Sequence, residues 1–167
     1  HDFSDKLGLD NKDRITFYLY SDNKFVNIGR HSNNSNFGIK KIGKEFPCSG
    51  NYISKSFNNE DEDFYVRMGL PDPDENLNKY TQEVGKDIGQ FNLTDCQKLT
   101  MRSRCYFGKK IYSSDRKPIG VLMIESRRVK LKVILNGAKK ELSKNVDYKN
   151  LSTVIDREFQ YILQSLY

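Results

Sequence analysis

The chain has 167 residues, a length that predicts one domain with a sizeable core. Hydrophobic residues make up 37% of it and charged residues 30%, which excludes a disordered polar chain, and no run approaches the roughly 20 apolar residues of a membrane helix. The net charge of +6 permits contact with an anion, but the basic residues are spread along the chain without a recognised motif, so we do not expect nucleic-acid binding.

The first thirteen residues are polar, with Phe3, Leu7 and Leu9 as their apolar positions. The chain begins with His1 rather than Met, which we interpret as a remnant of cloning before a piece of a longer protein. We therefore expect residues 1–13 to be the end of an N-terminal helix or to derive from cloning.

Two β-rich runs follow, at residues 14–20 (RITFYLY) and 24–30 (KFVNIGR), and Ser21-Asp22-Asn23 between them has the composition of a turn. They predict an antiparallel hairpin. Downstream, residues 37–42 are weakly strand-like, residues 50–57 fit a short helix that begins with a glycine, and residues 64–68 read as a short strand.

A break at residues 70–74 (LPDPD) precedes two predicted helices. Leu77, Tyr80 and Val84 have helical spacing, which predicts a helix over residues 74–86. Asn92 or Thr94 can cap a second helix that runs to about Met101. We expect both helices to cover one face of a sheet.

Residues 105–112 and 119–124 predict two strands joined by a polar turn. The second is almost wholly apolar, as is typical of a strand buried on both faces. Because Gly120 has no side chain, we expect a large side chain to pack against it or the strand to bend there. Residues 129–133 alternate apolar and basic, which favours an edge strand with a basic exposed face, with a helix as the alternative.

Residues 148–166 predict the clearest helix, because six apolar residues form one stripe: Leu151, Val154, Ile155, Phe159, Ile162 and Leu166. Such a stripe can cover the sheet alone, or cover it and also meet a second copy. In the second case part of Leu151, Ile155, Ile162 or Leu163 stays exposed on the monomer.

The segment Pro118–Ser126 (PIGVLMIES) resembles the strand that closes the sheet of GAF domains, and the hairpin at residues 14–30 resembles their opening strands. The resemblance covers roughly residues 14–166. It implies an α+β fold for a domain at residues 14–167. The expected fold is a central antiparallel sheet of about six strands with helices on both faces, the terminal helices on one and the pocket helices on the other.

GAF domains are sensory and regulatory modules, so the resemblance implies a non-enzymatic domain that binds a small ligand, anionic or nucleotide-like, of unknown identity. It implies signalling to an effector or membrane-anchoring segment upstream, a cytoplasmic location with or without a membrane tether, and a homodimer as one assembly. Two alternatives stay open. One is a GAF-type free methionine sulfoxide reductase that uses Cys48, Cys96 or Cys105, and the other is a module that binds nothing and only dimerises.

Six residues are the candidates for ligand binding: Arg30, Tyr52, Tyr65, Arg67, Arg102 and Arg104. Converging arginines can clamp a carboxylate or phosphate, and tyrosines can stack on a planar ring. We expect a pocket between the sheet and residues 50–57 and 74–101, with at least two of the four arginines facing it. The alternative for each arginine is a solvated strand end or a local ion pair.

We expect no catalytic residue and no metal site, because the sequence has no nucleophilic triad, phosphate-binding glycine loop or helical metal pair. His31 is expected to be a loop residue. The three cysteines have no metal-type spacing, and their odd number indicates free thiols in a reducing compartment.

Overall fold

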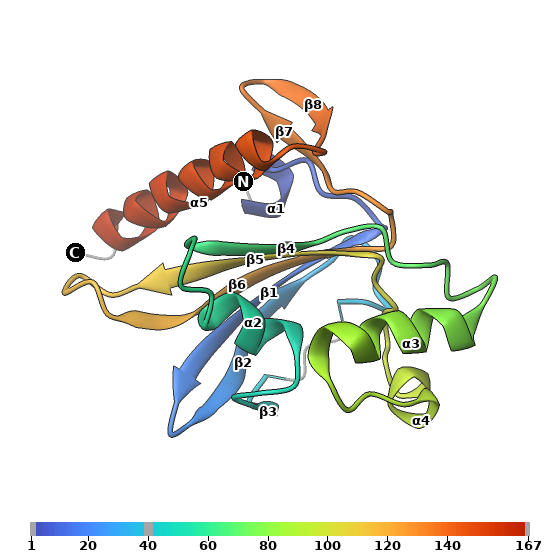
Figure 1. The fold of residues 1–167 in the computed structure, drawn as a ribbon. Coiled ribbons are helices and arrows are strands. Elements are labelled where there is room, and N and C mark those ends of the chain that lie inside the picture. The colour runs from blue at the N-terminus through green and yellow to red at the C-terminus, as the bar shows by residue number, and fades with distance from the viewer. Residues whose placement is uncertain (1–2, 39–41, 166–167) are drawn as a thin grey trace.

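The central element is a six-stranded sheet whose neighbouring strands are all antiparallel (Figure 1). The computed structural model describes residues 3–38 and 42–165, with side chains as far as residue 160. In spatial order the strands are β3 (Glu45–Pro47), β2 (Lys24–His31), β1 (Asp13–Ser21), β6 (Pro118–Ser126), β5 (Cys105–Tyr112) and β4 (Phe64–Arg67).

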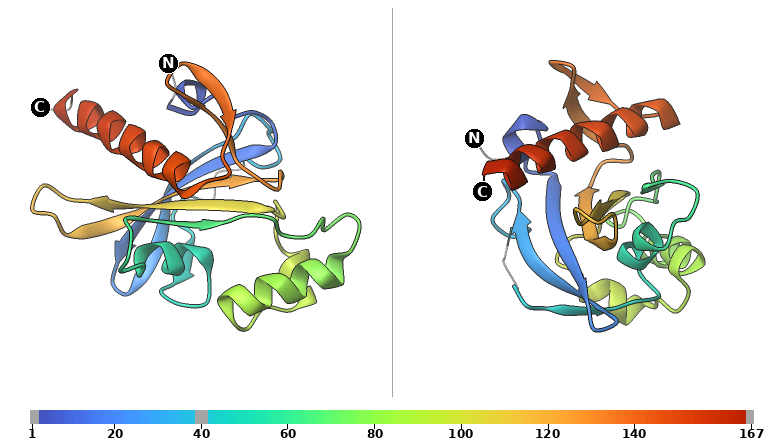
Figure 2. Two further views of the ribbon diagram at one scale, coloured as in Figure 1. Left: turned by 45° about the horizontal axis from the view of Figure 1, so that its top comes forward. Right: turned by 90° about the vertical axis from the view of Figure 1, so that its left-hand side faces the viewer.

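Helices lie on both faces of this sheet (Figures 1 and 2). One face carries α1 (Phe3–Lys6), α5 (Asn145–Ser165) and a separate hairpin of β7 (Lys132–Leu135) and β8 (Ala138–Glu141); the other carries α2 (Tyr52–Phe57), α3 (Leu77–Ile88) and α4 (Leu93–Gln97). The predicted fold class, α+β with terminal helices on one face and pocket helices on the other, is therefore confirmed. Within the described residues, no helix is long and apolar enough to cross a membrane.

The two faces hold two separate cores, because successive residues of a strand point to opposite sides. On β5 and β6, Phe107 and Ile124 belong to the core under α5, whereas Tyr106 and Met123 belong to the core under α2 and α3. The six residues from Val121 to Ser126 are all buried, which confirms the prediction of a central strand covered on both sides.

Asparagines begin the three helices of the second face. Asn51 and Asn92 each form a capping box with the residue three positions later, and the side chain of Asn76 accepts a hydrogen bond from the backbone N–H of Lys79. The cap at Asn76 explains why α3 begins at Leu77 rather than at residue 74 as predicted. The second predicted helix is also shorter than expected, since α4 ends at Gln97 and not near Met101.

One strand prediction is wrong and another is confirmed only in part. The described part of residues 37–42 contains no strand, and the edge of the sheet is formed instead by β3, which pairs with Lys24–Val26 of β2. The prediction for residues 129–133 is confirmed in part: Lys132 and Val133 begin β7, with Val133 buried and Lys132 exposed. This strand lies outside the main sheet, because β1 and β5 occupy both sides of β6. The chain bends away after Ser126 and forms β7, which pairs with β8 across the Asn136-Gly137 turn.

The described part of the apolar stripe of α5 covers its own sheet. Leu151 and Ile155 are fully buried, so the exposure that a two-fold contact would need is absent at these two positions, whereas the side chains of Ile162 and Leu163 lie outside the described residues. Phe159 meets Phe3 of α1 edge-on at 6.2 Å and lies 5.8 Å from Phe17 of β1. The short N-terminal helix therefore packs on α5, on the same face of the sheet.

Gly120 allows β6 and β1 to approach closely. A Cβ atom there would lie 2.2 Å from the carbonyl oxygen of Tyr18 and 3.3 Å from the Cα of Leu19. The close neighbour is thus the backbone of the adjacent strand, and the expectation of a large side chain packed against Gly120 is wrong. The pairing of β5 with β6 also changes register beside it, between Ile111 and Tyr112.

We predict that Gly120→Ala lowers the free energy of unfolding by about 1–3 kcal/mol, because β1 and β6 must move apart to accept the methyl group. Urea titration measures this change. Gly29→Ala is the matched control, since Gly29 lies on β2 with nothing within 4 Å of its added Cβ. Equal stability of the two variants would show that the contact at Gly120 relaxes without loss.

Candidate functional site

The candidate site is a cavity of about 260 Å³ between the sheet and the helices of the second face. Its floor comes from β1, β5 and β6, and its walls come from the start of α2, the end of α3 and the loop after α4. This is the position predicted from the sequence, between the sheet and residues 50–57 and 74–101. Of those two segments, residues 50–53 and 84–100 supply the lining.

A buried ion pair lies in the floor of the cavity. Arg14 of β1 and Glu125 of β6 are directly opposite each other in the sheet. Arg14 Nε and a terminal guanidinium nitrogen each donate to one carboxylate oxygen, both over 2.8 Å, and the two residues are only 7% and 6% exposed. Burial lowers the pKa of Arg14, but the carboxylate of Glu125 more than offsets this, so its pKa lies above the ordinary value.

Arg30 lines the cavity beside this pair. It lies opposite Thr16 in the β1–β2 ladder; its Nε donates to the Thr16 hydroxyl over 3.1 Å, and a terminal nitrogen donates to the Tyr18 hydroxyl over 3.5 Å. Both acceptors are neutral, and within the described residues Arg30 contacts no carboxylate. Lys44 and Lys98 also line the cavity, so four cationic side chains share it with one carboxylate.

Aromatic rings form the wall of the cavity on the α2 side. Tyr52 stacks on Tyr106 with ring centroids 4.1 Å apart, and Tyr18 meets Phe46 edge-on at 5.3 Å. The Tyr52 hydroxyl donates to Asp87 of α3 over 2.7 Å. Burial and this hydrogen bond both raise the pKa of Tyr52, which therefore stays neutral at physiological pH.

The six residues predicted from the sequence are not brought together. Arg30 and Tyr52 line the cavity, but the other four do not, and the expectation that at least two of the four arginines face it is wrong. Arg67 is held by Asp87 at 2.5 Å and Arg104 by Asp72 at 3.0 Å.

The remaining two candidates are placed by local contacts. Arg102 donates to the carbonyl of Cys96 over 3.3 Å. Tyr65 stacks behind Tyr52, with ring centroids 6.4 Å apart. Arg14 and Glu125 line the cavity but were not among the residues predicted to bind a ligand. The sequence places them at the start of one predicted strand and just after the end of another, which does not indicate that they meet.

The chain is similar in structure to the GAF domain of a two-component sensor histidine kinase from Bacillus halodurans. The identity is 16%, the similarity covers 92% of this chain and 87% of that one, and the TM-score is 0.45. No family model matches the chain. No curated protein matches it either.

The cysteines do not form a reactive pair in this structure. Cys96 and Cys105 are fully buried, and burial raises the pKa of Cys105 to about 12, so its thiolate is scarce at neutral pH. Cys48 is exposed in the loop before α2. Within the described residues, no group of three or more His, Cys, Asp or Glu could hold a metal ion.

We predict that only Cys48 of the native protein reacts rapidly with Ellman's reagent, because a thiol must be ionised and accessible to react. All three thiols should react once the protein is unfolded in guanidinium chloride. In Cys48→Ser the rapid phase should disappear. A rapid phase that persists in this variant would show that Cys96 or Cys105 is accessible, and would favour the reductase alternative.

Proposed function

We propose that this chain is a non-enzymatic sensory or regulatory domain that binds a small anionic molecule with a planar ring in the cavity beside Arg30. The observation that carries the proposal is the unbalanced charge of Arg30. Its guanidinium is held in place by two hydroxyl groups and has no carboxylate neighbour among the described residues. A carboxylate or phosphate on a ligand would supply that partner.

The other charges of the cavity favour the same kind of ligand. Glu125 gives both oxygens to Arg14, so it neutralises Arg14 and leaves Arg30 and Lys98 to set the sign of the potential. Lys98 is exposed at the rim, where it can attract an anion without a desolvation penalty. Because Glu125 is fully engaged, it is also a poor general base, which supports binding rather than catalysis.

The size and the walls of the cavity favour a small ligand with a ring. A volume of about 260 Å³ falls just below the range of about 300–1,000 Å³ that is typical of sites for drug-sized molecules. Tyr52 and Phe91 are among the lining residues, and the Tyr52 ring is fixed by its stack on Tyr106 and its bond to Asp87. A rigid aromatic wall suits a flat ring.

In this proposal, a signal passes from the cavity to the other face of the sheet through β1 and β6. On β1 and β6, Arg14 and Glu125 face the cavity, and their neighbours Ile15 and Ile124 belong to the core under α5. A ligand that shifts these strands would therefore also shift the packing of α5. We propose that the terminal helices carry this change to an attached effector domain.

The proposal is tested by calorimetric titration with three anions and their neutral analogues: benzoate and benzamide, phenyl phosphate and phenol, adenosine monophosphate and adenosine. At least one anion should bind, and its neutral analogue should bind at least about tenfold more weakly, since a charged hydrogen-bonded contact contributes about 1.5–3 kcal/mol. Arg30→Gln should weaken binding of the anion by a similar factor.

Lys79→Gln is the control for the change in charge, because Lys79 is exposed on α3 and does not line the cavity. This variant should bind as the parent does. An Arg30→Gln variant with unchanged affinity for the anion, or equal binding of an anion and its neutral analogue, would contradict the proposal.

A further inference from the structure

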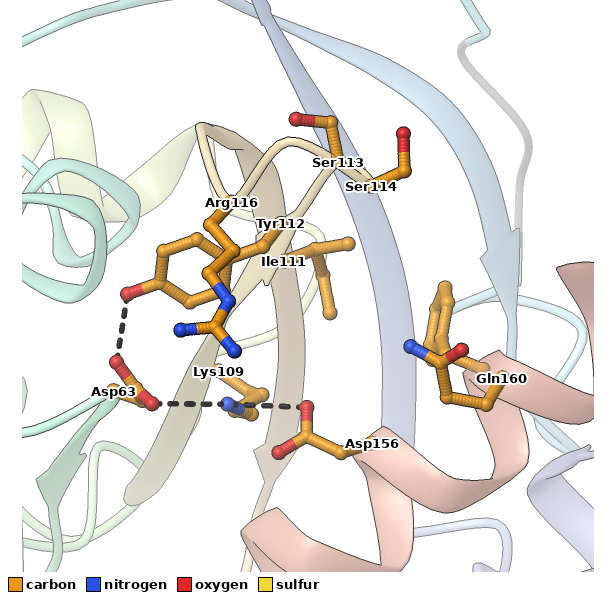
Figure 3. Close-up of a pocket in the computed structure, with 10 residues that line it drawn as sticks. Asp63, Lys109, Ile111, Tyr112, Ser113, Ser114, Arg116, Asp156 and Gln160 are labelled. Atoms are coloured by element: carbon orange, nitrogen blue, oxygen red, sulfur yellow. Dashed lines mark hydrogen bonds and ion pairs between the residues drawn. The ribbon is translucent and has the colours of Figure 1, made fainter.

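A second hollow lies on the opposite face of the sheet, between α5, the far end of β5 and the β5–β6 turn (Figure 3). It is an open groove of about 600 Å³ and shares no lining residue with the cavity described above. Four charged side chains from four different segments line it: Asp63 before β4, Lys109 on β5, Arg116 in the turn and Asp156 on α5.

Lys109 anchors the groove. Its side chain is only 1% exposed, and its ammonium group lies 3.2 Å from Oδ1 of Asp156 and 3.8 Å from Oδ2 of Asp63. The hydroxyl of Tyr112 donates to the other oxygen of Asp63 over 2.6 Å. Because a buried charge needs partners, these contacts hold Lys109 in place and leave it unavailable to a ligand, and they orient Asp63 at the edge of the groove.

The remaining groups are one cation and one carboxylate oxygen. The guanidinium of Arg116 points into the groove and makes no hydrogen bond or ion pair with any described residue (Figure 3). Oδ2 of Asp156 likewise accepts no hydrogen bond from the described residues. Ile111 and Phe159 add an apolar surface beside these two groups.

We propose that this groove binds an apolar α-amino acid, with the ligand carboxylate on Arg116, its ammonium group on Asp156, and its side chain against Ile111 and Phe159. The charges select this class. Lys109 and Arg116 disfavour a plain cation, and Asp63 and Asp156 disfavour a plain anion, whereas a zwitterion satisfies both signs. The guanidinium plane suits a carboxylate, which it binds through two parallel hydrogen bonds.

Such a ligand would join α5 to the β5–β6 turn, because Asp156 and Phe159 are on the helix and Arg116 is in the turn. Its binding would therefore stabilise the contact between the C-terminal helix and the sheet. The inference does not depend on the function proposed for the first cavity, since the two sites lie on opposite faces and differ in every lining residue.

The test is calorimetric titration of the whole chain with L-leucine, L-methionine and L-phenylalanine. For L-leucine the matched analogues are 4-methylpentanoate, which lacks the ammonium group, and 3-methylbutylamine, which lacks the carboxylate. At least one amino acid should bind with a millimolar or lower Kd, and each singly charged analogue should bind at least about tenfold more weakly. If none of the three amino acids binds at millimolar concentration, or if the analogues bind equally well, the proposal is overturned.

Two variants locate the site. Arg116→Gln should weaken binding at least about tenfold, and because Arg116 is exposed in a turn this variant should fold as the parent does. Asp156→Asn should weaken binding as well. Lys117→Gln, which removes the next charge in the same turn, and Arg30→Gln, which alters the other cavity, should bind as the parent does. Parental affinity in Arg116→Gln, or equal losses in Arg30→Gln, would overturn the assignment to this groove.

Discussion

The buried ion pair of Arg14 and Glu125 is the constraint on which the rest of the structure depends. The two residues are 111 positions apart in the chain and meet between the two central strands of the sheet, near one end, where Glu125 also lies opposite Tyr106 in the β5–β6 ladder. Removing two charges from water is costly, so the pair is stable only with both hydrogen bonds formed. A slip of one residue between β1 and β6 would turn every side chain of one strand to the other face, and would leave both charges unpaired among apolar groups.

A close contact between α2 and β5 places the ring of Tyr52 in the wall of the cavity that contains this pair. At Gly108 of β5, an added Cβ would lie 1.8 Å from the hydroxyl oxygen of Ser56, so α2 rests directly on the strand. The Ser56 hydroxyl donates to the carbonyl of Tyr52 one turn earlier, and the ring of Tyr52 then stacks on Tyr106. The missing side chain at residue 108 thus sets the distance between α2 and the sheet, and with it the shape of the cavity.

The sheet and its helices could be predicted from the sequence because their signals are local. The β-rich runs in residues 14–30, the apolar run of β6 and the stripe of α5 each identify an element without knowledge of the others. Asn92 was predicted as a helix cap in the same way, whereas the caps at Asn51 and Asn76 were not. The sequence does not show that β7 and β8 form a sheet of their own, because a strand pattern does not reveal that both sides of β6 are already occupied.

The lining of the cavity could not be predicted, because it depends on which charges meet across the fold. Arg67 and Arg104 look equivalent to Arg30 in the sequence, yet aspartates 20 and 32 positions away hold both of them. Arg14 looks like the first residue of a strand, and only the register of β1 against β6 places it on the cavity floor. The position of the pocket follows from the fold class, whereas its chemistry follows from long-range pairing.

A double-mutant cycle on Arg14 and Glu125 tests the central claim most directly. Unfolding in urea would be measured for the parent, Arg14→Met, Glu125→Met and the double variant. Each single variant leaves one buried charge alone and should lose about 3–5 kcal/mol, whereas the double variant should lose clearly less than the sum, with a coupling above about 1.5 kcal/mol. Additive losses, with a coupling below about 0.5 kcal/mol, would contradict the claim that this pair holds the sheet in register.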